Sequence, residues 1–180
     1  DTTVNSSPTD ISGKGNHGAF YGTSQHYSPA DKAFNFDGGG SYIFTPGIGN
    51  TIDNWVHSIS VWVFAPAHGE TIFHIGHALG GQNQNIGLET EATGKIRYFF
   101  YSNDVQTPTN SFPLNTWNHV VVTYDGGSVL TSRSVYINGV KQVINLVSGH
   151  VLAALDLQEA NTDAYIGIQR GGGKPFYGKM

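Results

Sequence analysis

The sequence predicts an all-β protein, a two-sheet antiparallel sandwich of the jelly-roll type, and three observations carry this prediction. Residues 117–124, Trp-Asn-His-Val-Val-Val-Thr-Tyr, are rich in the β-branched and aromatic residues that suit a pleated strand. Asn138-Gly139 follows a second such run and is the strongest short-range hairpin signal. Glycine is abundant, with 24 of 180 residues, and only 12% of residues are charged. Such a composition is typical of β proteins with many turns.

Short apolar and β-branched runs, separated by Gly, Asn and Asp turns, predict about eleven strands in one domain. Pro66 ends one of the clearest runs, because proline cannot donate a hydrogen bond to a strand ladder. Residues 151–155, Val-Leu-Ala-Ala-Leu, are the exception and predict one short helical turn. The predicted strands are 19–21, 33–36, 41–44, 58–65, 71–76, 85–89, 95–101, 117–124, 135–137, 140–144 and 164–168.

The run at 117–124 places alternate residues on opposite faces, and both faces are mostly apolar. We therefore expect this strand to be central in its sheet and covered on both sides. By the same reasoning, Trp62 and Trp117 belong to the core. His119 is expected to pack there too, held by a hydrogen bond.

Charge and composition exclude several functions. The formal net charge is 9 − 13 = −4, and the chain has no basic cluster, so a nucleic-acid partner is not expected. No apolar run approaches the roughly 18 residues of a membrane-spanning helix, so membrane insertion is not expected. There is no cysteine, which removes disulfide and thiolate chemistry. A cysteine-free β domain rich in Gly, Asn and Thr predicts an extracellular, cell-surface or virion location.

Four segments, taken in order, carry a family resemblance. They are the turn at 10–18 (Asp-Ile-Ser-Gly-Lys-Gly-Asn-His-Gly), the strand pair within 33–43, the strand at 58–63, and 117–126 with 135–139. This pattern resembles the laminin-G-like branch of the concanavalin A-like lectin/glucanase superfamily. The resemblance implies a jelly roll of two stacked antiparallel sheets, one of them concave, over residues 1–180.

Both ends of the chain depart from the family pattern. Domains of this kind usually begin with an apolar-aromatic strand and end with a longer strand that contains Asp-Asp. Here Asp1 stands where the first strand would finish, and residues 176–180 stop as the last would begin. The expectation is a domain without its usual first and last strands. Its open edge would be covered by the rest of a longer polypeptide or by other protein chains of a larger assembly.

A glycan is the expected ligand, because the concave face and its rim carry aromatic and amide groups. A sugar ring stacks its C–H face on an aromatic ring, and its hydroxyl groups bond to amides and charged groups. Tyr98 and Tyr101 alternate with other residues, so the alternative is that one of them faces the core. Trp55 and His57 lie close enough in the pattern to join the site. The predicted ligand-binding residues are Gln82, Gln84, Arg97, Tyr98, Tyr101 and Asn103.

Two segments contain residues that could bind a metal ion. The turn at 10–18 offers Asp10, Asn16 and glycine carbonyls, which are oxygen ligands that suit a structural Ca²⁺, and the resemblance implies a calcium near this turn. The alternative is that both side chains only stabilise an Asx turn. His74 and His77, with His68 upstream, invite a zinc interpretation, but residues three apart on a strand point to opposite faces.

Catalysis is not expected. Glu89 and Glu91 share one strand face, as paired carboxylates of a glycoside hydrolase would, but they lack a third acid and lie at a hairpin end, where solvated side chains are common. The sequence therefore predicts a non-catalytic recognition module for glycans. The alternatives are a structural or decoration module of a virion or extracellular filament with no glycan ligand, and a degenerate glycoside-active enzyme.

Overall fold

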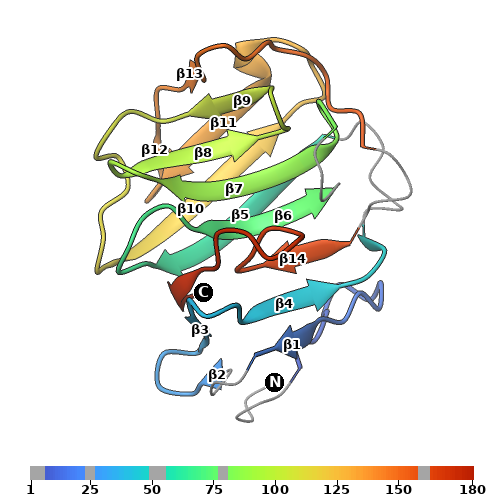
Figure 1. Ribbon diagram of the computed structural model, residues 1–180, viewed down its shortest axis with the longest axis vertical. Coiled ribbons are helices and arrows are strands. Elements are labelled where there is room, and N and C mark those ends of the chain that lie inside the picture. The colour runs from blue at the N-terminus through green and yellow to red at the C-terminus, as the bar shows by residue number, and fades with distance from the viewer. Residues whose placement is uncertain (1–6, 23–26, 49–55, 77–80, 158–162) are drawn as a thin grey trace.

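The computed structural model describes residues 7–22, 27–48, 56–76, 81–157 and 163–180. Two antiparallel sheets stack face to face in it, which confirms the predicted all-β sandwich (Figure 1). The eight-stranded sheet has the order β1 (Ala19–Tyr21), β4 (Tyr42–Thr45), β14 (Ala164–Ile166), β6 (Thr71–Gly76), β7 (Asn85–Glu91), β8 (Lys95–Phe99), β9 (Asp104–Gln106) and β13 (Asn145–Leu146). The seven-stranded sheet has the order β12 (Val140–Lys141), β11 (Arg133–Ile137), β10 (Trp117–Tyr124), β5 (His57–Phe64), β15 (Tyr177–Lys179), β3 (Ala33–Asp37) and β2 (Tyr27–Ser28).

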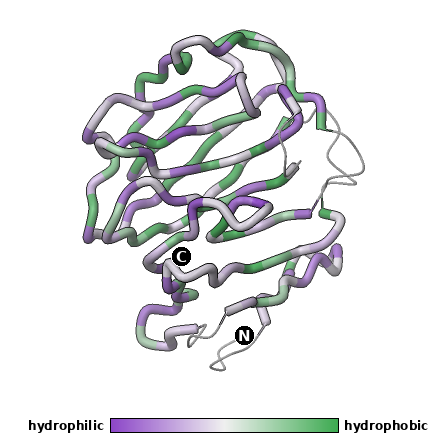
Figure 2. Tube along the Cα trace, viewed as in Figure 1, coloured by the Kyte–Doolittle hydropathy of each residue, from purple (hydrophilic) through white to green (hydrophobic). Residues whose placement is uncertain are grey.

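The core lies between the sheets and is built by alternation along the strands, which a register shift interrupts in β6 between Thr71 and Phe73. Hydrophobic and hydrophilic residues follow one another along the strands of both sheets (Figure 2). Val120 and Val122 of β10 point inward and are fully buried, as are Leu88 of β7 and Tyr98 of β8. Each such side chain contributes about 1.5–3 kcal/mol through burial. Alternation therefore also decides which side chains remain on the outer faces of the two sheets.

β10 is central in its sheet, as predicted, but it is covered on one side only. It pairs with β5 along all eight residues and with β11 on its other edge. Its even-numbered residues are buried, whereas the odd-numbered ones are half-buried on the outer face. The expectation that Trp62, Trp117 and His119 lie in the core is wrong: Trp62 is 57% exposed, and Trp117 and His119 are half-buried on the outer face, where His119 stacks beside Trp62. All three residues alternate with buried residues of their strands, so they point outward.

The hairpin between β11 and β12 confirms the strongest local signal. Asn138 has φ 52° and Gly139 has φ 78°, and Ile137 pairs with Val140 across the two-residue turn. Positive φ at both central residues defines a type I′ turn, whose twist matches that of the strands. The helical turn expected at 151–155 is wrong, because that segment is irregular, and the described residues instead contain a 3₁₀ turn at Leu130–Ser132.

The C-terminal strand β15 lies inside the seven-stranded sheet, between β3 and β5. Phe34 and Met180 exchange two backbone hydrogen bonds, and Lys179 pairs with Phe64 of β5. Gly178 has φ 140° and passes so close to the Phe64 carbonyl that a side chain would collide with it. The domain boundaries and the missing outer strands stay predictions. In the described part of the chain, no helix is long and apolar enough to cross a membrane.

Candidate ligand-binding site

Three loops meet at one end of the eight-stranded sheet, and we call them the rim cluster: residues 81–84, 100–103 and 151–156. The Asn83 N–H donates to the Tyr101 carbonyl at 3.2 Å, and the Asp156 N–H donates to the Asn83 carbonyl at 2.8 Å. The Val151 N–H donates to the Ser102 carbonyl at 3.2 Å. Backbone contacts thus join segments that are about 70 residues apart in the sequence.

Asn103 and Arg133 form a buried polar pair that holds the loops of the rim cluster in place. The Asn103 amide donates to the Asn83 Oδ1 at 2.8 Å and to the Ala153 carbonyl at 2.7 Å. Arg133 of β11 donates to the Asn103 carbonyl and Oδ1 at 3.0 and 2.9 Å, and its guanidinium lies 4.2 Å from the centre of the Phe100 ring. Burial lowers the pKa of Arg133 from its ordinary value. A buried cation held this way orders the loops without offering a group to a ligand.

Tyr101 is the exposed aromatic residue of the rim cluster. Its side chain is 46% exposed, and its backbone has φ 65°, while Ser102 next to it has φ 55°. Two consecutive non-glycine residues in the left-handed region cost of order 1–3 kcal/mol each and persist only where surrounding contacts impose them. Gln82 is exposed in the neighbouring loop, and Gln84 is half-buried. The structure therefore brings Gln82, Gln84 and Tyr101 to one end of the molecule.

Tyr98 and Asn103 cannot contact a surface ligand, and this part of the sequence expectation is wrong. Tyr98 is 0% exposed, its hydroxyl is hydrogen-bonded to His57 Nε2, and its ring meets Phe100 edge-on. Burial raises the pKa of the Tyr98 phenol. Asn103 is also 0% exposed and supports the rim cluster from inside. Period-two alternation could have excluded Tyr98, because Arg97 beside it faces out. Trp55 lies outside the described residues.

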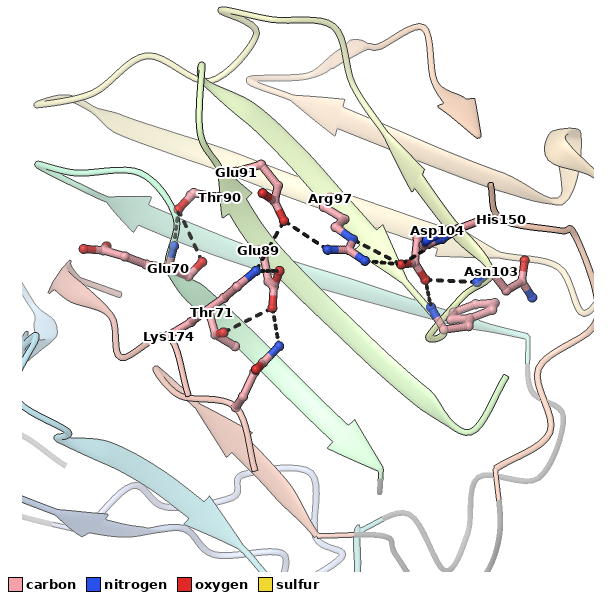
Figure 3. Close-up of polar contacts among 12 residues, drawn as sticks. Glu70, Thr71, Glu89, Thr90, Glu91, Arg97, Asn103, Asp104, His150 and Lys174 are labelled. Atoms are coloured by element: carbon pink, nitrogen blue, oxygen red, sulfur yellow. Dashed lines mark hydrogen bonds and ion pairs between the residues drawn. The ribbon is translucent and has the colours of Figure 1, made fainter. Parts of the chain in front are cut away.

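Arg97 takes part in a row of ion pairs on the outer face of the eight-stranded sheet (Figure 3). It donates two hydrogen bonds to Asp104 and one to Glu91 at 3.2 Å, and His150 Nδ1 lies 3.2 Å from Asp104 Oδ2. Burial alone would lower the pKa of Arg97, but Asp104 and Glu91 outweigh it and raise the pKa. The Arg97 side chain is 27% exposed, so it adds a partly accessible cation next to the rim cluster.

Glu89 and Glu91 occupy the same outer face, and Glu91 ends β7 at the hairpin to β8, both as expected from the sequence, but Glu89 is not solvated. Glu89 is 0% exposed, and it accepts hydrogen bonds from Lys174 at 2.7 Å and from Gln169 at 2.6 Å. Burial raises the pKa of Glu89, against the opposing effect of Lys174. Burial acts in the same sense on Glu91, but Lys174 and Arg97 together lower its pKa. Both carboxylates are thus bonded to basic or amide groups of the chain itself.

His74 lies beside this row and is also covered. It is 4% exposed, its ring stacks on Phe99, and Nε2 is hydrogen-bonded to Asn85 at 3.1 Å while Nδ1 accepts the Arg170 N–H at 3.3 Å. Burial lowers the pKa of His74 to about 4. His77, the second residue of the zinc interpretation, lies outside the described residues. Within the described ranges, no three His, Cys, Asp or Glu side chains gather to hold a metal ion.

The turn at 10–18 has the geometry of an Asx turn. Asp10 accepts the Ser12 N–H on Oδ1 and the Asn16 N–H on Oδ2, both at 2.8 Å. These hydrogen bonds, led by Ser12, lower the pKa of Asp10 from its ordinary value. Both carboxylate oxygens are thus used inside the turn. The calcium expected at Asp10 and Asn16 stays a prediction. The hydrogen bonds of the turn fit the alternative, in which these two residues only stabilise an Asx turn.

The sequence could not have revealed several residues that shape this region. Lys174 and Gln169 come from the segment between β14 and β15, which crosses the outer face of the sheet (Figure 1). His150 comes from a second segment that covers Asp104. Arg133 reaches Asn103 from the opposite sheet. None of the four stands in a motif with its partner, so only the folded chain brings them together.

Comparison with solved structures gives several similar folds. Domains LG4-5 of the mouse laminin α1 chain match with a TM-score of 0.58 and 14% identity, covering 81% of this chain and 39% of that one. Domain 4 of AbnA, an extracellular arabinanase of Geobacillus stearothermophilus, in complex with arabinotriose, matches with a TM-score of 0.54 and 22% identity, covering 96% and 76%. The CBM40 of a Ruminococcus gnavus sialidase, bound to α2,3-sialyllactose, matches with a TM-score of 0.52 and 12% identity, covering 69% and 71%.

These likenesses concern the fold, and the chain spans about two fifths of the laminin fragment it matches. A search of curated protein sequences finds no significant match. A family model described as the concanavalin A-like lectin/glucanases superfamily, laminin G type, matches residues 37–180. Because this match covers most of the chain and agrees with the stacked sheets, the protein belongs to the concanavalin A-like lectin/glucanase superfamily.

Proposed function

We propose that this domain is a non-catalytic carbohydrate-binding module that takes a glycan at the rim cluster. The observation that carries the proposal is Tyr101, an exposed ring held in a left-handed backbone conformation by neighbouring loops. Gln82 and Gln84 supply amide groups next to it, and Arg97 supplies a partly exposed cation. Tyr98 and Asn103 have no direct role in this proposal, because both are buried.

The physical argument rests on preorganisation. A sugar ring stacks on an aromatic face and gains little from each hydroxyl contact, so a site that is already ordered loses less entropy on binding. The contacts through Asn83, Asn103 and Ala153 supply that order before any ligand arrives. Strain in a non-glycine residue at a loop tip is found more often at ligand sites than elsewhere.

The comparisons support the class of function without assigning a sugar. Two of the similar folds were solved with bound glycans, arabinotriose in one and α2,3-sialyllactose in the other. An extracellular setting is part of the proposal, since laminin domains and an extracellular arabinanase share the fold. A cell-surface or virion location and other protein chains of a larger assembly stay predictions.

Glycan-array screening followed by calorimetry on the strongest binder tests the proposal. Tyr101→Ala is expected to weaken binding about tenfold or more, which corresponds to roughly 1.4 kcal/mol of lost stacking. Tyr21→Ala is the matched control, because Tyr21 is also 46% exposed but lies on β1, at the opposite edge of the same sheet. Absence of binding to every glycan, or equal loss in both variants, would contradict the proposal. The first of these outcomes would favour a structural or decoration module.

A structural calcium at Asp10 and Asn16 is a separate proposal with its own measurement. A ligand that binds the native state raises stability by mass action, so added Ca²⁺ would raise the melting temperature and EDTA would lower it. Asp10→Asn should remove the calcium response. An unchanged melting temperature with both additions would leave only the Asx turn, which already uses both carboxylate oxygens.

A further inference from the structure

The outer face of the seven-stranded sheet carries a hollow of about 400 Å³, on the opposite side of the molecule from the outer face of the eight-stranded sheet. Trp62 of β5 and Trp117 of β10 line it, together with Asp31, Lys32 and Met180. A volume of this size is in the range of small-ligand pockets. The lining combines indole rings with a carboxylate and an ammonium group, which suits a ligand with both apolar and polar faces.

Trp62 is held as a fixed wall of this hollow. It lies directly across the strand pair from His119, and the two rings stack with centres 5.0 Å apart and planes inclined by 21°. The His119 ring is itself held by a 2.8 Å hydrogen bond to Ser60 Oγ. His119 is on the β10 side of Trp62, whereas Asp31, Lys32 and Met180 of the hollow come from the segments next to β3 and β15 on its other side. An indole 57% exposed and backed by a second ring is a ready stacking surface.

A second hollow of about 270 Å³ lies next to the first on the same face. Tyr177, which is 51% exposed, lines it with Asn35, Phe64 and Lys179. The Phe64 ring lies 5.8 Å from the Trp117 ring of the first hollow. Lys179 Nζ reaches 2.8 Å from Asp31 Oδ2, so an ion pair connects the two hollows. The result is a trough with an exposed aromatic ring in each half and polar groups between them.

We propose that this trough is a second carbohydrate-binding site, which takes an oligosaccharide of at least two sugar units. Trp62 and Tyr177 stack one unit each, while Asn35, Lys32 and the Asp31–Lys179 pair bond to hydroxyl groups. Two separate rings with polar groups between them match a chain of sugar rings, whose apolar faces are interrupted by hydroxyls. This site is independent of Tyr101, because it lies on the other sheet.

Tryptophan fluorescence and calorimetry, with arabinose, xylose and glucose oligosaccharides of one to four units as probes, test this site. Affinity should rise about tenfold or more from one unit to three, because the second ring adds its own stacking contribution. Trp62→Ala should lower the affinity at this site about tenfold or more, Trp62→Tyr should retain part of it, and Tyr101→Ala should leave it unchanged. Circular dichroism melting curves establish that each variant is folded.

The two proposed sites fail in distinguishable ways. Loss of all binding in Tyr101→Ala, or unchanged binding in folded Trp62→Ala, would overturn the trough and leave the rim cluster standing. Loss of binding in Trp62→Ala alone would support the trough and count against the rim cluster. The absence of binding to every probe would overturn the trough. Concentration-dependent self-association that Trp62→Ala abolishes would overturn it too, because the face would then be an interface between two copies of the chain.

Discussion

The outer faces of the two sheets obey the same alternation and carry opposite chemistry. On the eight-stranded sheet, Glu89 points away from the core and is nevertheless 0% exposed, bonded to Lys174 and Gln169. On the seven-stranded sheet, Trp62 points away from the core and is 57% exposed. The sequence suggested the reverse for both residues: a carboxylate in solvent and an indole in the core.

The difference between the faces comes from what lies over them. The segment between β14 and β15 crosses the eight-stranded sheet and brings Lys174 onto β7, and a second segment brings His150 onto Asp104 (Figure 3). A carboxylate tolerates burial only when charge and hydrogen bonds compensate for lost water, and the crossing segments supply both. In the described part of the chain, the ring that stacks on Trp62 is His119, and it covers one side. Strand periodicity therefore assigns a face, while the loops decide whether that face meets water.

The largest effect is expected when Lys174, the ion-pair partner of Glu89, is replaced. Lys174→Met leaves a buried carboxylate without its counter-ion, and breaking such a pair costs about 3 kcal/mol, near the lower end for buried pairs because Lys174 is partly exposed. Chemical unfolding measures the loss, and the melting temperature should fall by roughly 10 °C.

The matched control is Lys141→Met, the same substitution at an exposed position of β12 on the other sheet. It should change stability by less than about 0.5 kcal/mol. A Lys174→Met, Glu89→Gln double variant should recover much of the loss, because the uncompensated charge is gone. Equal effects at Lys174 and Lys141 would contradict the idea that the crossing segment makes one face an interior.

Local sequence patterns predict most of the fold. Strict alternation at β5 and β10 and the Asn138-Gly139 turn gave strands, faces and a hairpin that the structure confirms. These signals are local, since backbone geometry fixes period two and turn type without knowledge of the rest of the chain. The sequence pattern does not predict β9 and β15, because three residues that include Asp104 or Gly178 show no strand periodicity on their own, and it does not predict the two-residue strands β2 and β13.

The sequence predicts only part of the candidate site. The sequence predicts Gln82 and Tyr101 as an amide and an aromatic group of the rim, and the structure places both on exposed loops of the rim cluster. Asn103 looks the same in sequence, yet Arg133 and Ala153 enclose it. Asn103 is enclosed because it contacts Arg133 and Ala153, which lie 30 and 50 residues away in the sequence. No local pattern encodes such a contact.

His74 gives a smaller, pH-dependent test of the covered face. Burial lowers its pKa to about 4, so the folded protein stays unprotonated there while the unfolded chain takes up a proton below about 6.5. Between these values the unfolded state binds more protons, and stability falls as the pH falls. Between pH 6.5 and pH 5, this proton uptake should lower the free energy of unfolding by about 2 kcal/mol, at roughly 1.4 kcal/mol per pH unit.

His74→Gln should remove this contribution, so the decline in stability between pH 7 and pH 5 should be about 2 kcal/mol shallower than in the unaltered protein. Unfolding curves at both pH values measure it, and His119→Gln on the outer face of the other sheet is the control that should keep the decline. The slope is informative even though His74→Gln also loses the stacking on Phe99, because that packing loss is the same at both pH values. A slope unchanged by His74→Gln would mean that water reaches this imidazole, and that the segment carrying Arg170 does not seal the face above it.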